Sequence, residues 1–309
     1  MKKIIIIGGP TASYKSSLAL ELAKQYNGVI INADSIQVYF EIPILSSQPS
    51  IEERELVPHK LYSFVSGEFV YSVGKWLDEV VKEVRVAHEI GMVPIIVGGT
   101  GLYINSVING LSKIPEIDPD LRDNIRSLYE RIGKDEFYGL LEKRDVEVAK
   151  KIFSGDKHRV IRAFEVIEQT GKSILYWQQM ANFSPFDKES IITILSSLPR
   201  DLLYKRCNDR FVSMIEEGAL DEVEYLNKNL PDSTLPITKA LGVRELSDYL
   251  SGTASLVDSI ARAQTGIRKF AKRQVTWFKN QTKDIDKIEY ASPEDFGNIV
   301  KYVSENLIA

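Results

Sequence analysis

Short runs of β-branched residues recur along the chain, and each run is ended by glycine or polar residues. Residues 4–7 are four consecutive isoleucines followed by Gly-Gly-Pro. Runs of this length and composition are typical of strands that are buried on both faces of a sheet. Comparable apolar runs occupy 29–32, 94–97 and 191–198. Apolar residues at helical spacing fill 16–26 and 73–90. Strands that alternate with helices predict a parallel sheet with right-handed crossovers.

The pattern changes between the third and fourth predicted strands. From about residue 118 to 180 the chain carries many charges and little strand signal, with helical patterns over 121–132 and 156–170. After residue 198 helical patterns return, over 202–217, 220–227 and 259–280. The sequence therefore predicts an α/β core formed by 1–112 and 190–309, which is interrupted by a helical insertion domain at 113–189.

The composition is that of a globular protein, since 44% of the 309 residues are apolar and 27% are charged. A net charge of −4 argues against a non-specific nucleic-acid coat but allows a local basic surface. Cys207 is the single cysteine, so no intramolecular disulfide can form. The N-terminal apolar run ends at Gly8, too early for an export signal, and no apolar stretch approaches the about 20 residues of a membrane span. We therefore expect a cytoplasmic protein that does not associate with membranes.

The clearest chemical signal directly follows the first predicted strand. It is the run Gly9-Pro10-Thr11-Ala12-Ser13-Tyr14-Lys15-Ser16, which fits the phosphate-binding loop (P-loop) G-x-x-x-x-G-K-[ST] at every fixed position except Tyr14. In such a loop, backbone N–H groups at a helix N-terminus surround a diphosphate. Lys15 would supply charge to the phosphate oxygens, and the Ser16 hydroxyl would ligate Mg²⁺. The alternative is an ordinary turn between a strand and a helix.

Two further segments follow predicted strands at their carboxyl ends, where α/β proteins bind ligands. The segment 32–39 carries Asp34, a candidate general base or ligand of magnesium-bound water. The alternative for Asp34 is an N-cap at a turn into a helix. The segment 97–103 has three glycines in four positions, which would bring the backbone close to a ligand and leave the Thr100 hydroxyl facing the cleft. A tight turn is the alternative there.

Together, these three segments resemble the tRNA dimethylallyltransferases (tRNA isopentenyltransferases). That family carries Gly-Pro-Thr-Ala-Ser-Gly-Lys-Ser, Asp-Ser-x-Gln-Val-Tyr and Gly-Gly-Thr-Gly-Leu-Tyr in this order. The resemblance runs nearly the full length, through 118–122, 158–166 and 272–278. It departs at Tyr14, where the family has glycine, and at 42–49, which lacks the family's lysine and glycine–threonine pair. The resemblance implies a P-loop kinase-like parallel sheet flanked by helices, in which the loop holds a prenyl diphosphate rather than ATP.

The resemblance also implies a reaction and the residues that perform it. Members of the family transfer a dimethylallyl group from its diphosphate to the exocyclic amine of the adenosine that is 3′-adjacent to the anticodon in tRNA. Asp34 would accept a proton or hydrogen bond from that amine, Thr100 would contact the same site, and Lys15 would act on the diphosphate. The loop 9–16 would bind dimethylallyl diphosphate, with Mg²⁺ on Ser16. The residues implied for tRNA binding are Asp34, Ser35, Ile36, Gln37, Thr100, Arg122, His158, Arg159, Val160, Ile161, Arg162, Lys239 and Arg244.

Two basic segments lie outside these motifs. Arg206 and Arg210 are four residues apart on a predicted helix, so both side chains would reach over the loop 9–16 and bind the diphosphate as it leaves. The alternative is pairing with nearby acidic residues. Residues 268–277 combine basic and aromatic side chains, which is typical either of RNA contact or of a solvated helix face with buried aromatics.

Three functions remain open from the residues alone. The first is a Mg²⁺-dependent prenyltransferase that acts as a monomer on the anticodon stem-loop of tRNA. The second is a P-loop small-molecule kinase or NTPase, which would bind ATP or another nucleotide and use Asp34 to hold magnesium-bound water. The third is a non-catalytic tRNA-binding protein whose loop has lost its function at Tyr14. Only the transferase requires prenyl diphosphate and tRNA together.

Overall fold

The structure is a computed structural model that describes residues 2–180 and 184–308. The chain divides into two compact units, one formed by Met1–Ile108 with Pro185–Ala309 and the other by Asn109–Ser184. The sequence placed the insertion at 113–189. In the structure the residues after 184 belong with the core, where Phe186 packs against one of its apolar clusters.

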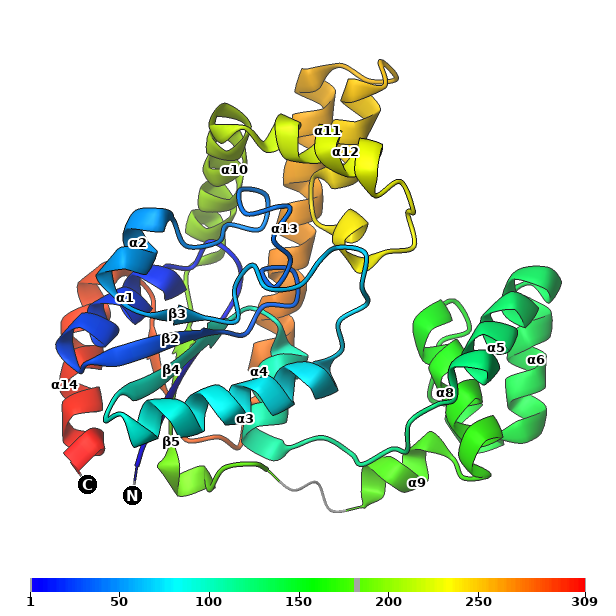
Figure 1. Cartoon of the computed structure of the whole chain (residues 1–309), viewed down its shortest axis with the longest axis horizontal. Coiled ribbons are helices and arrows are strands. Elements are labelled where there is room, and N and C mark those ends of the chain that lie inside the picture. The colour runs from blue at the N-terminus through cyan, green and yellow to red at the C-terminus, as the bar shows by residue number, and fades with distance from the viewer. Residues whose placement is uncertain (1, 181–183, 309) are drawn as a thin grey trace. The chain divides into compact units, whose positions relative to one another are not determined.

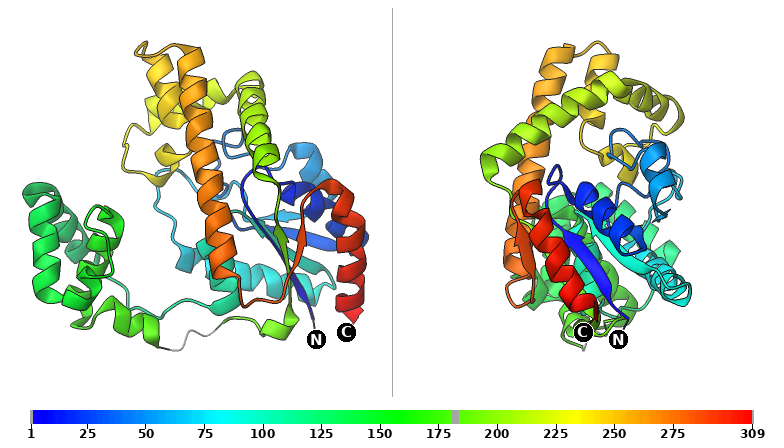
Figure 2. Two further views of the ribbon diagram at one scale, coloured as in Figure 1. Left: turned by 180° about the vertical axis from the view of Figure 1, so that it is seen from behind. Right: turned by 90° about the vertical axis from the view of Figure 1, so that its left-hand side faces the viewer.

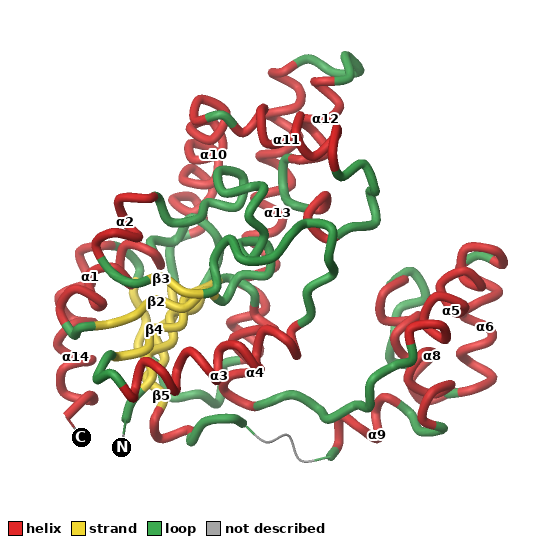
Figure 3. Tube along the Cα trace, viewed as in Figure 1, coloured by secondary structure: helices red, strands yellow, loops and turns green. Residues whose placement is uncertain are grey.

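The first unit is built on one sheet. In the described part of the chain its strands are β1 (Ile4–Gly8), β2 (Gly28–Asn32), β3 (His59–Lys60), β4 (Val93–Gly98), β5 (Ile191–Ser196) and β6 (Ile288–Tyr290). They pair in the order β3-β2-β4-β1-β5-β6, and each of these pairs is parallel. Figure 3 shows the strands gathered together with helices around them. The predicted α/β class is therefore confirmed.

The described helices of the first unit are α1 (Lys15–Gln25), α2 (Ile51–Leu56), α3 (Val73–Glu89), α4 (Gly101–Asn109), α10 (Arg200–Glu217), α11 (Ala219–Asn229), α12 (Val243–Leu250), α13 (Leu256–Gln281) and α14 (Phe296–Ile308). Some of them cover the two faces of the sheet. Because successive side chains of a strand point to opposite faces, Ile5 and Ile7 of β1 pack with α1, α10 and α14, whereas Ile4 and Ile6 pack with α3 and α4. Figures 1 and 2 show these two groups of helices. None of the described helices combines the length and the apolar composition that crossing a membrane requires.

The second unit is helical. It contains α5 (Pro119–Ile132), α6 (Lys134–Arg144), α7 (Val146–Ala149), α8 (Lys157–Thr170) and α9 (Ile174–Gln179). Phe137 and Leu141 of α6 and Phe164 of α8 are buried in its apolar core, together with residues of α5. The start of α8 is set by Asp156, whose carboxylate accepts a hydrogen bond from a backbone N–H of the first turn. The insertion therefore has an apolar core of its own.

Candidate active site

The three sequence motifs follow strands whose carboxyl ends lie side by side. β4 pairs with both β1 and β2, in registers that place Gly98 opposite Gly8 and Val97 opposite Asn32. The loop 9–16 therefore begins on one side of the end of β4, and Asp34 follows on the other side. The carboxyl edge of a parallel sheet is the usual place for a ligand in this class of fold.

The loop between β1 and α1 curls back on itself. The Ser13 hydroxyl donates a hydrogen bond to the Pro10 carbonyl at 2.8 Å, and the Lys15 ammonium donates to the same carbonyl. Ala12 and Tyr14 have left-handed backbones, with φ of 61° and 64°. This conformation costs a residue other than glycine on the order of 1–2 kcal/mol, and strain of this kind collects at ligand-binding loops. Tyr14 thus has a conformation that glycine would adopt without strain.

Three cationic side chains converge on this loop. The Arg206 Nε donates to the Ala12 carbonyl at 2.8 Å, and Arg210 donates to the Thr11 hydroxyl. Burial, and then the charge of Arg210, lowers the pKa of Lys15 from 10.5 to about 7. Among the described residues no acidic side chain forms an ion pair with any of the three cations, so the alternative of acidic pairing fails for both arginines. Such a concentration of positive charge favours an anionic ligand.

Gln274 of α13 ties two of the motif loops together. Its Oε1 accepts a hydrogen bond from the Thr11 N–H at 2.9 Å, and its Nε2 donates to the Gly99 carbonyl at 2.9 Å. The side chain is buried, so this bridge is shielded from water. Sequence reasoning missed this role, because residues 11, 99 and 274 are brought together only by the fold.

Asp34 lies in a turn that its own carboxylate closes. Its Oδ1 accepts a hydrogen bond from the Ile36 N–H at 2.9 Å, and its backbone N–H donates to Oδ1 of the fully buried Asn32 at 2.8 Å. The N-cap alternative is wrong, because the next described helix, α2, begins only at residue 51. The carboxylate is thus oriented by local bonds and lines a cavity.

Thr100 supports this turn from the end of β4. Its Oγ1 accepts a hydrogen bond from the Ser35 N–H at 3.0 Å, and the hydroxyl lies 3.3 Å from the Ser35 Oγ. Gly98 and Gly99 line the cavity, and the glycines of this segment are also required for packing. A Cβ on Gly98 would lie 2.0 Å from the Ala33 carbonyl oxygen, and one on Gly101 would lie 2.3 Å from the ring of Trp277. A side chain at Gly98 would require the backbone of Ala33 to move, and one at Gly101 would require the Trp277 ring to move.

Residues of all three motif segments, the two arginines and Gln274 line one cavity of about 530 Å³. This volume falls in the range of small-molecule sites, about 300–1,000 Å³. Its polar wall includes the loop from residue 11 to 17, Asp34, Thr100 and the two arginines of α10. Its apolar wall includes Leu45, Phe211, Met214, Leu241, Ile267 and Phe270. The cavity therefore combines anion-binding groups, a carboxylate and a hydrophobic surface.

Known proteins share this sequence and fold. The family model described as IPP transferase matches residues 37–281, and the one described as isopentenyl transferase matches residues 2–62. The tRNA dimethylallyltransferase of Wolbachia pipientis wMel is 46% identical over 291 residues, which cover 94% of this chain and 96% of that protein. The chain belongs to the tRNA dimethylallyltransferase family. The resemblance predicted from the sequence motifs is thereby confirmed.

Two solved structures of similar proteins have the same fold. The tRNA isopentenylpyrophosphate transferase of Bacillus halodurans is 31% identical with a TM-score of 0.71, and the match covers 99% of this chain and 97% of that one. A eukaryotic dimethylallyltransferase acting on tRNA is 28% identical with a TM-score of 0.84, and the match covers 100% of this chain and 80% of that one.

The segment 42–49, where this chain departs from other tRNA dimethylallyltransferases, is fixed by two side chains. The carboxylate of Glu222 accepts hydrogen bonds from the N–H groups of 44–45 at 2.7 and 2.9 Å. The Nε2 of Gln37 donates to the carbonyls of 46–47 at 2.9 and 2.8 Å. Gln37, which was predicted to bind tRNA, therefore also supports the wall of the cavity.

The structure corrects one part of the predicted tRNA-binding set. Val160 and Ile161 of α8 are only 0% and 7% exposed, because they pack in the core of the insertion. Their side chains stabilise this unit and are not accessible to RNA, whereas the other three residues of 158–162 are exposed or half-buried. In the first unit, Lys239 lines the cavity and Arg244 is exposed on α12.

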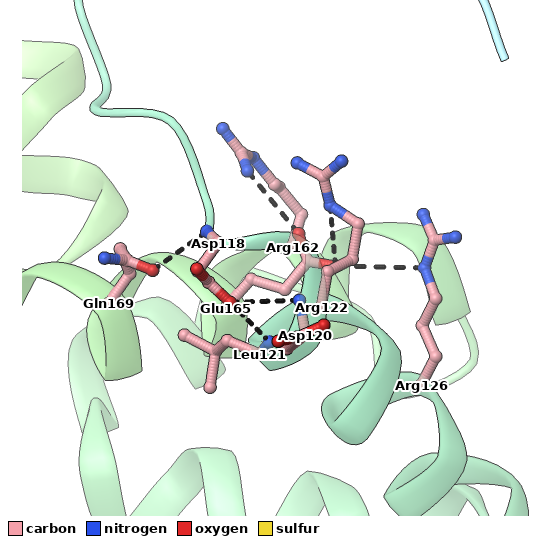
Figure 4. Close-up of polar contacts among 8 residues, drawn as sticks. All are labelled: Asp118, Asp120, Leu121, Arg122, Arg126, Arg162, Glu165 and Gln169. Carbon is pink, nitrogen blue, oxygen red and sulfur yellow. Dashed lines mark hydrogen bonds and ion pairs between the residues drawn. The ribbon is translucent and has the colours of Figure 1, made fainter.

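Glu165 of α8 lies at the centre of an arginine cluster in the insertion (Figure 4). Its carboxylate is 5% exposed and lies 3.4 Å from Nη1 of Arg162 and 3.9 Å from Nε of both Arg122 and Arg126. Figure 4 shows the three guanidinium groups directed to the same side. The cluster carries two more positive than negative charges. Arg126 was not predicted as a site residue. Its position four residues after Arg122 on one helix could have indicated that the two arginines lie on the same face.

Proposed function

We propose that the protein transfers the dimethylallyl group of dimethylallyl diphosphate to the exocyclic amine of the adenosine 3′-adjacent to the anticodon in tRNA. The observation that carries this proposal is the single cavity in which the cations Lys15, Arg206 and Arg210, the carboxylate of Asp34 and an apolar wall occur together. The cations suit the diphosphate, the carboxylate suits the amine, and the apolar wall suits the five-carbon chain. Membership of the tRNA dimethylallyltransferase family supports tRNA as the acceptor.

The diphosphate would lie on the loop 9–16, where N–H groups at the start of α1 and the three cations neutralise its charge. The amine nitrogen forms a bond to C1 of the dimethylallyl group while the bond from C1 to the diphosphate oxygen breaks. The diphosphate leaves with the electron pair, and the proton of the amine passes to the carboxylate of Asp34. Neutralising the leaving group as its charge develops is the main source of rate in such a site.

The adenine must leave its stack before its amine can reach this cavity. Unpaired loops of RNA allow this at low cost, which suits a base beside an anticodon. Thr100 would act here as a positioning residue, because its Oγ1 holds the Ser35 N–H and thereby the turn that carries Asp34.

The residues present fit Mg²⁺, which prefers oxygen ligands and keeps several waters. The Ser16 hydroxyl lies in the exposed first turn of α1 and lines the cavity together with Asp34. No group of three or more His, Cys, Asp or Glu among the described residues is arranged to hold a metal ion. Ser16 is the residue that would hold Mg²⁺. When bound, the ion adds positive charge beside the leaving group.

Incubation of the protein with radiolabelled dimethylallyl diphosphate, Mg²⁺ and unmodified tRNA tests the proposed function. Label should appear in the RNA, and only when all three are present. ATP hydrolysis without RNA would instead indicate a kinase or NTPase. Binding of tRNA without transfer of label would indicate a non-catalytic tRNA-binding protein.

We further propose that the arginine cluster around Glu165 contacts the phosphates of the tRNA stem. The double variant Arg126→Gln/Arg162→Gln should bind tRNA about 20-fold more weakly at ~0.15 M salt, because each lost phosphate contact removes a salt-dependent term from the affinity. The slope of log affinity against log salt should become shallower by the amount that corresponds to the loss of about two phosphate contacts. Measurement of the tRNA dissociation constant over a series of salt concentrations checks both values.

Arg131→Gln is the matched control for this prediction. Arg131 is exposed on the same helix, α5. It follows Arg122 by nine residues, a spacing that places it on the opposite side of the helix. Its loss should leave the tRNA affinity within about twofold of wild type. Equal tRNA binding by the double variant and the control would place the RNA surface elsewhere. The melting temperature of each variant reports whether the insertion remains folded.

A further inference from the structure

Tyr14 places a large side chain in the loop 9–16 at a position where the motif calls for glycine. It is the N-cap residue of α1, with φ 64° and ψ 12°, and its side chain makes no capping hydrogen bond. A left-handed backbone is unstrained for glycine but strained for tyrosine. Strain of this kind persists where the surrounding structure holds the residue in place, so the contacts of the Tyr14 side chain are informative.

The ring packs against the apolar cluster that contains Ile5 and Ile7, and it also lies against Arg206 of α10. The Cζ of Arg206 lies 3.5 Å from the centroid of the Tyr14 ring, well inside the roughly 6 Å limit of a cation–π interaction. The Nε of the same guanidinium donates to the Ala12 carbonyl at 2.8 Å. The group is thus fixed at one face by the ring and at one edge by the loop. Within the part of the chain that the structure describes, its two terminal nitrogens have no protein partner, so their N–H groups are available to a ligand.

The neighbouring cations repel Arg206. Lys15 and Arg210 line the same cavity, and like charges at short range disfavour one another. Burial, and to a smaller extent the charge of Arg206, lowers the pKa of Arg210. The negative face of an aromatic ring attracts a guanidinium and offsets this repulsion before any anion is bound.

We propose that Tyr14 is a positioning residue for Arg206, and that its ring holds the guanidinium over the loop so that an incoming diphosphate meets a donor already in place. Such pre-organisation raises affinity, because less side-chain freedom is lost when the ligand binds. This role depends on the proposed function, since it takes a diphosphate ester as the ligand of the loop. The expected effect is on KM for the diphosphate substrate and not on kcat, because the ring acts through Arg206.

Three variants separate the ring from the backbone strain. Tyr14→Phe keeps the aromatic face and should bind inorganic pyrophosphate within about twofold of wild type. Tyr14→Leu keeps the backbone strain but has no aromatic face, and it should bind about three- to thirtyfold more weakly. Tyr14→Gly relieves the strain but also loses the ring, so KM for dimethylallyl diphosphate should change by less than about tenfold. In all three, kcat should stay within about twofold of wild type.

The Arg206→Gln variant provides the decisive comparison. In this background Tyr14→Leu should have no further effect on the affinity for pyrophosphate, because the partner of the ring is gone. Equal losses in both backgrounds, or a loss in Tyr14→Phe as large as in Tyr14→Leu, would overturn the inference. If the wild type binds pyrophosphate and substitutions of residue 14 do not change the affinity, the inference is overturned and the proposed function still stands. A wild type that binds no pyrophosphate would overturn both.

Discussion

Replacing Asp34 by asparagine is expected to lower kcat about 10²–10⁴-fold, the range found when a general base is lost. Asparagine keeps an oxygen that can accept the Ile36 N–H bond of 2.9 Å, so the turn stays closed. An amide, however, cannot take the proton that the adenine amine loses. KM for dimethylallyl diphosphate should change little, because the cations around the diphosphate remain. Steady-state kinetics at saturating tRNA check both values.

Asp34→Ala serves as the companion variant, because it removes the proton acceptor and the hydrogen bond to Ile36 together. Its kcat should be at least as low as that of Asp34→Asn, and its melting temperature should fall further. Near-normal kcat in the asparagine variant would show that the carboxylate only closes the turn. Low kcat in the alanine variant alone would lead to the same conclusion.

The central strands of the fold could be predicted because each carries its own local signal. β1, β2, β4 and β5 are apolar runs of five or six residues ended by polar or glycine residues, as expected for strands buried on both faces. β3 and β6 have two and three residues, too few to show a pattern, and their pairing depends on the strands already in place. The edge of the sheet is therefore set by tertiary structure and not by local sequence.

Some residues of the candidate site could likewise be predicted from local sequence, and others could not. Helical spacing predicted that Arg206 and Arg210 share one face of a helix, and the structure directs that face at the loop. No local rule connects Gln274 with Thr11, which are 263 residues apart along the chain. Burial likewise depends on the whole insertion, which is why Val160 and Ile161 could not be separated from their exposed neighbours by sequence position alone.

Lys15 is expected to make the affinity for dimethylallyl diphosphate depend on pH. Burial and the neighbouring charge of Arg210 lower the pKa of Lys15 to about 7, so above this pH the free protein carries a neutral amine. A bound diphosphate favours the ammonium and raises its pKa, so binding above pH 7 takes up a proton. Below pH 7 the ionisation of Lys15 should therefore not change the dissociation constant. Above pH 7 the dissociation constant should increase with pH, by up to about tenfold per pH unit. Titration calorimetry between pH 7 and 9, in buffers of different ionisation enthalpy, measures the affinity and the proton uptake.

Lys15→Met should remove this pH dependence and lower kcat/KM about 10²–10³-fold, the usual cost of losing one group that stabilises developing negative charge. Methionine has nearly the same length and flexibility as lysine, so the loop keeps its packing while the charge is lost. The remaining cations, Arg206 and Arg210, do not substitute for Lys15, because they approach the loop from α10 through Ala12 and Thr11. A pH slope that persists in the methionine variant would assign the titration to another group. A kcat/KM close to that of wild type would mean that the two arginines and Mg²⁺ neutralise the leaving diphosphate without Lys15.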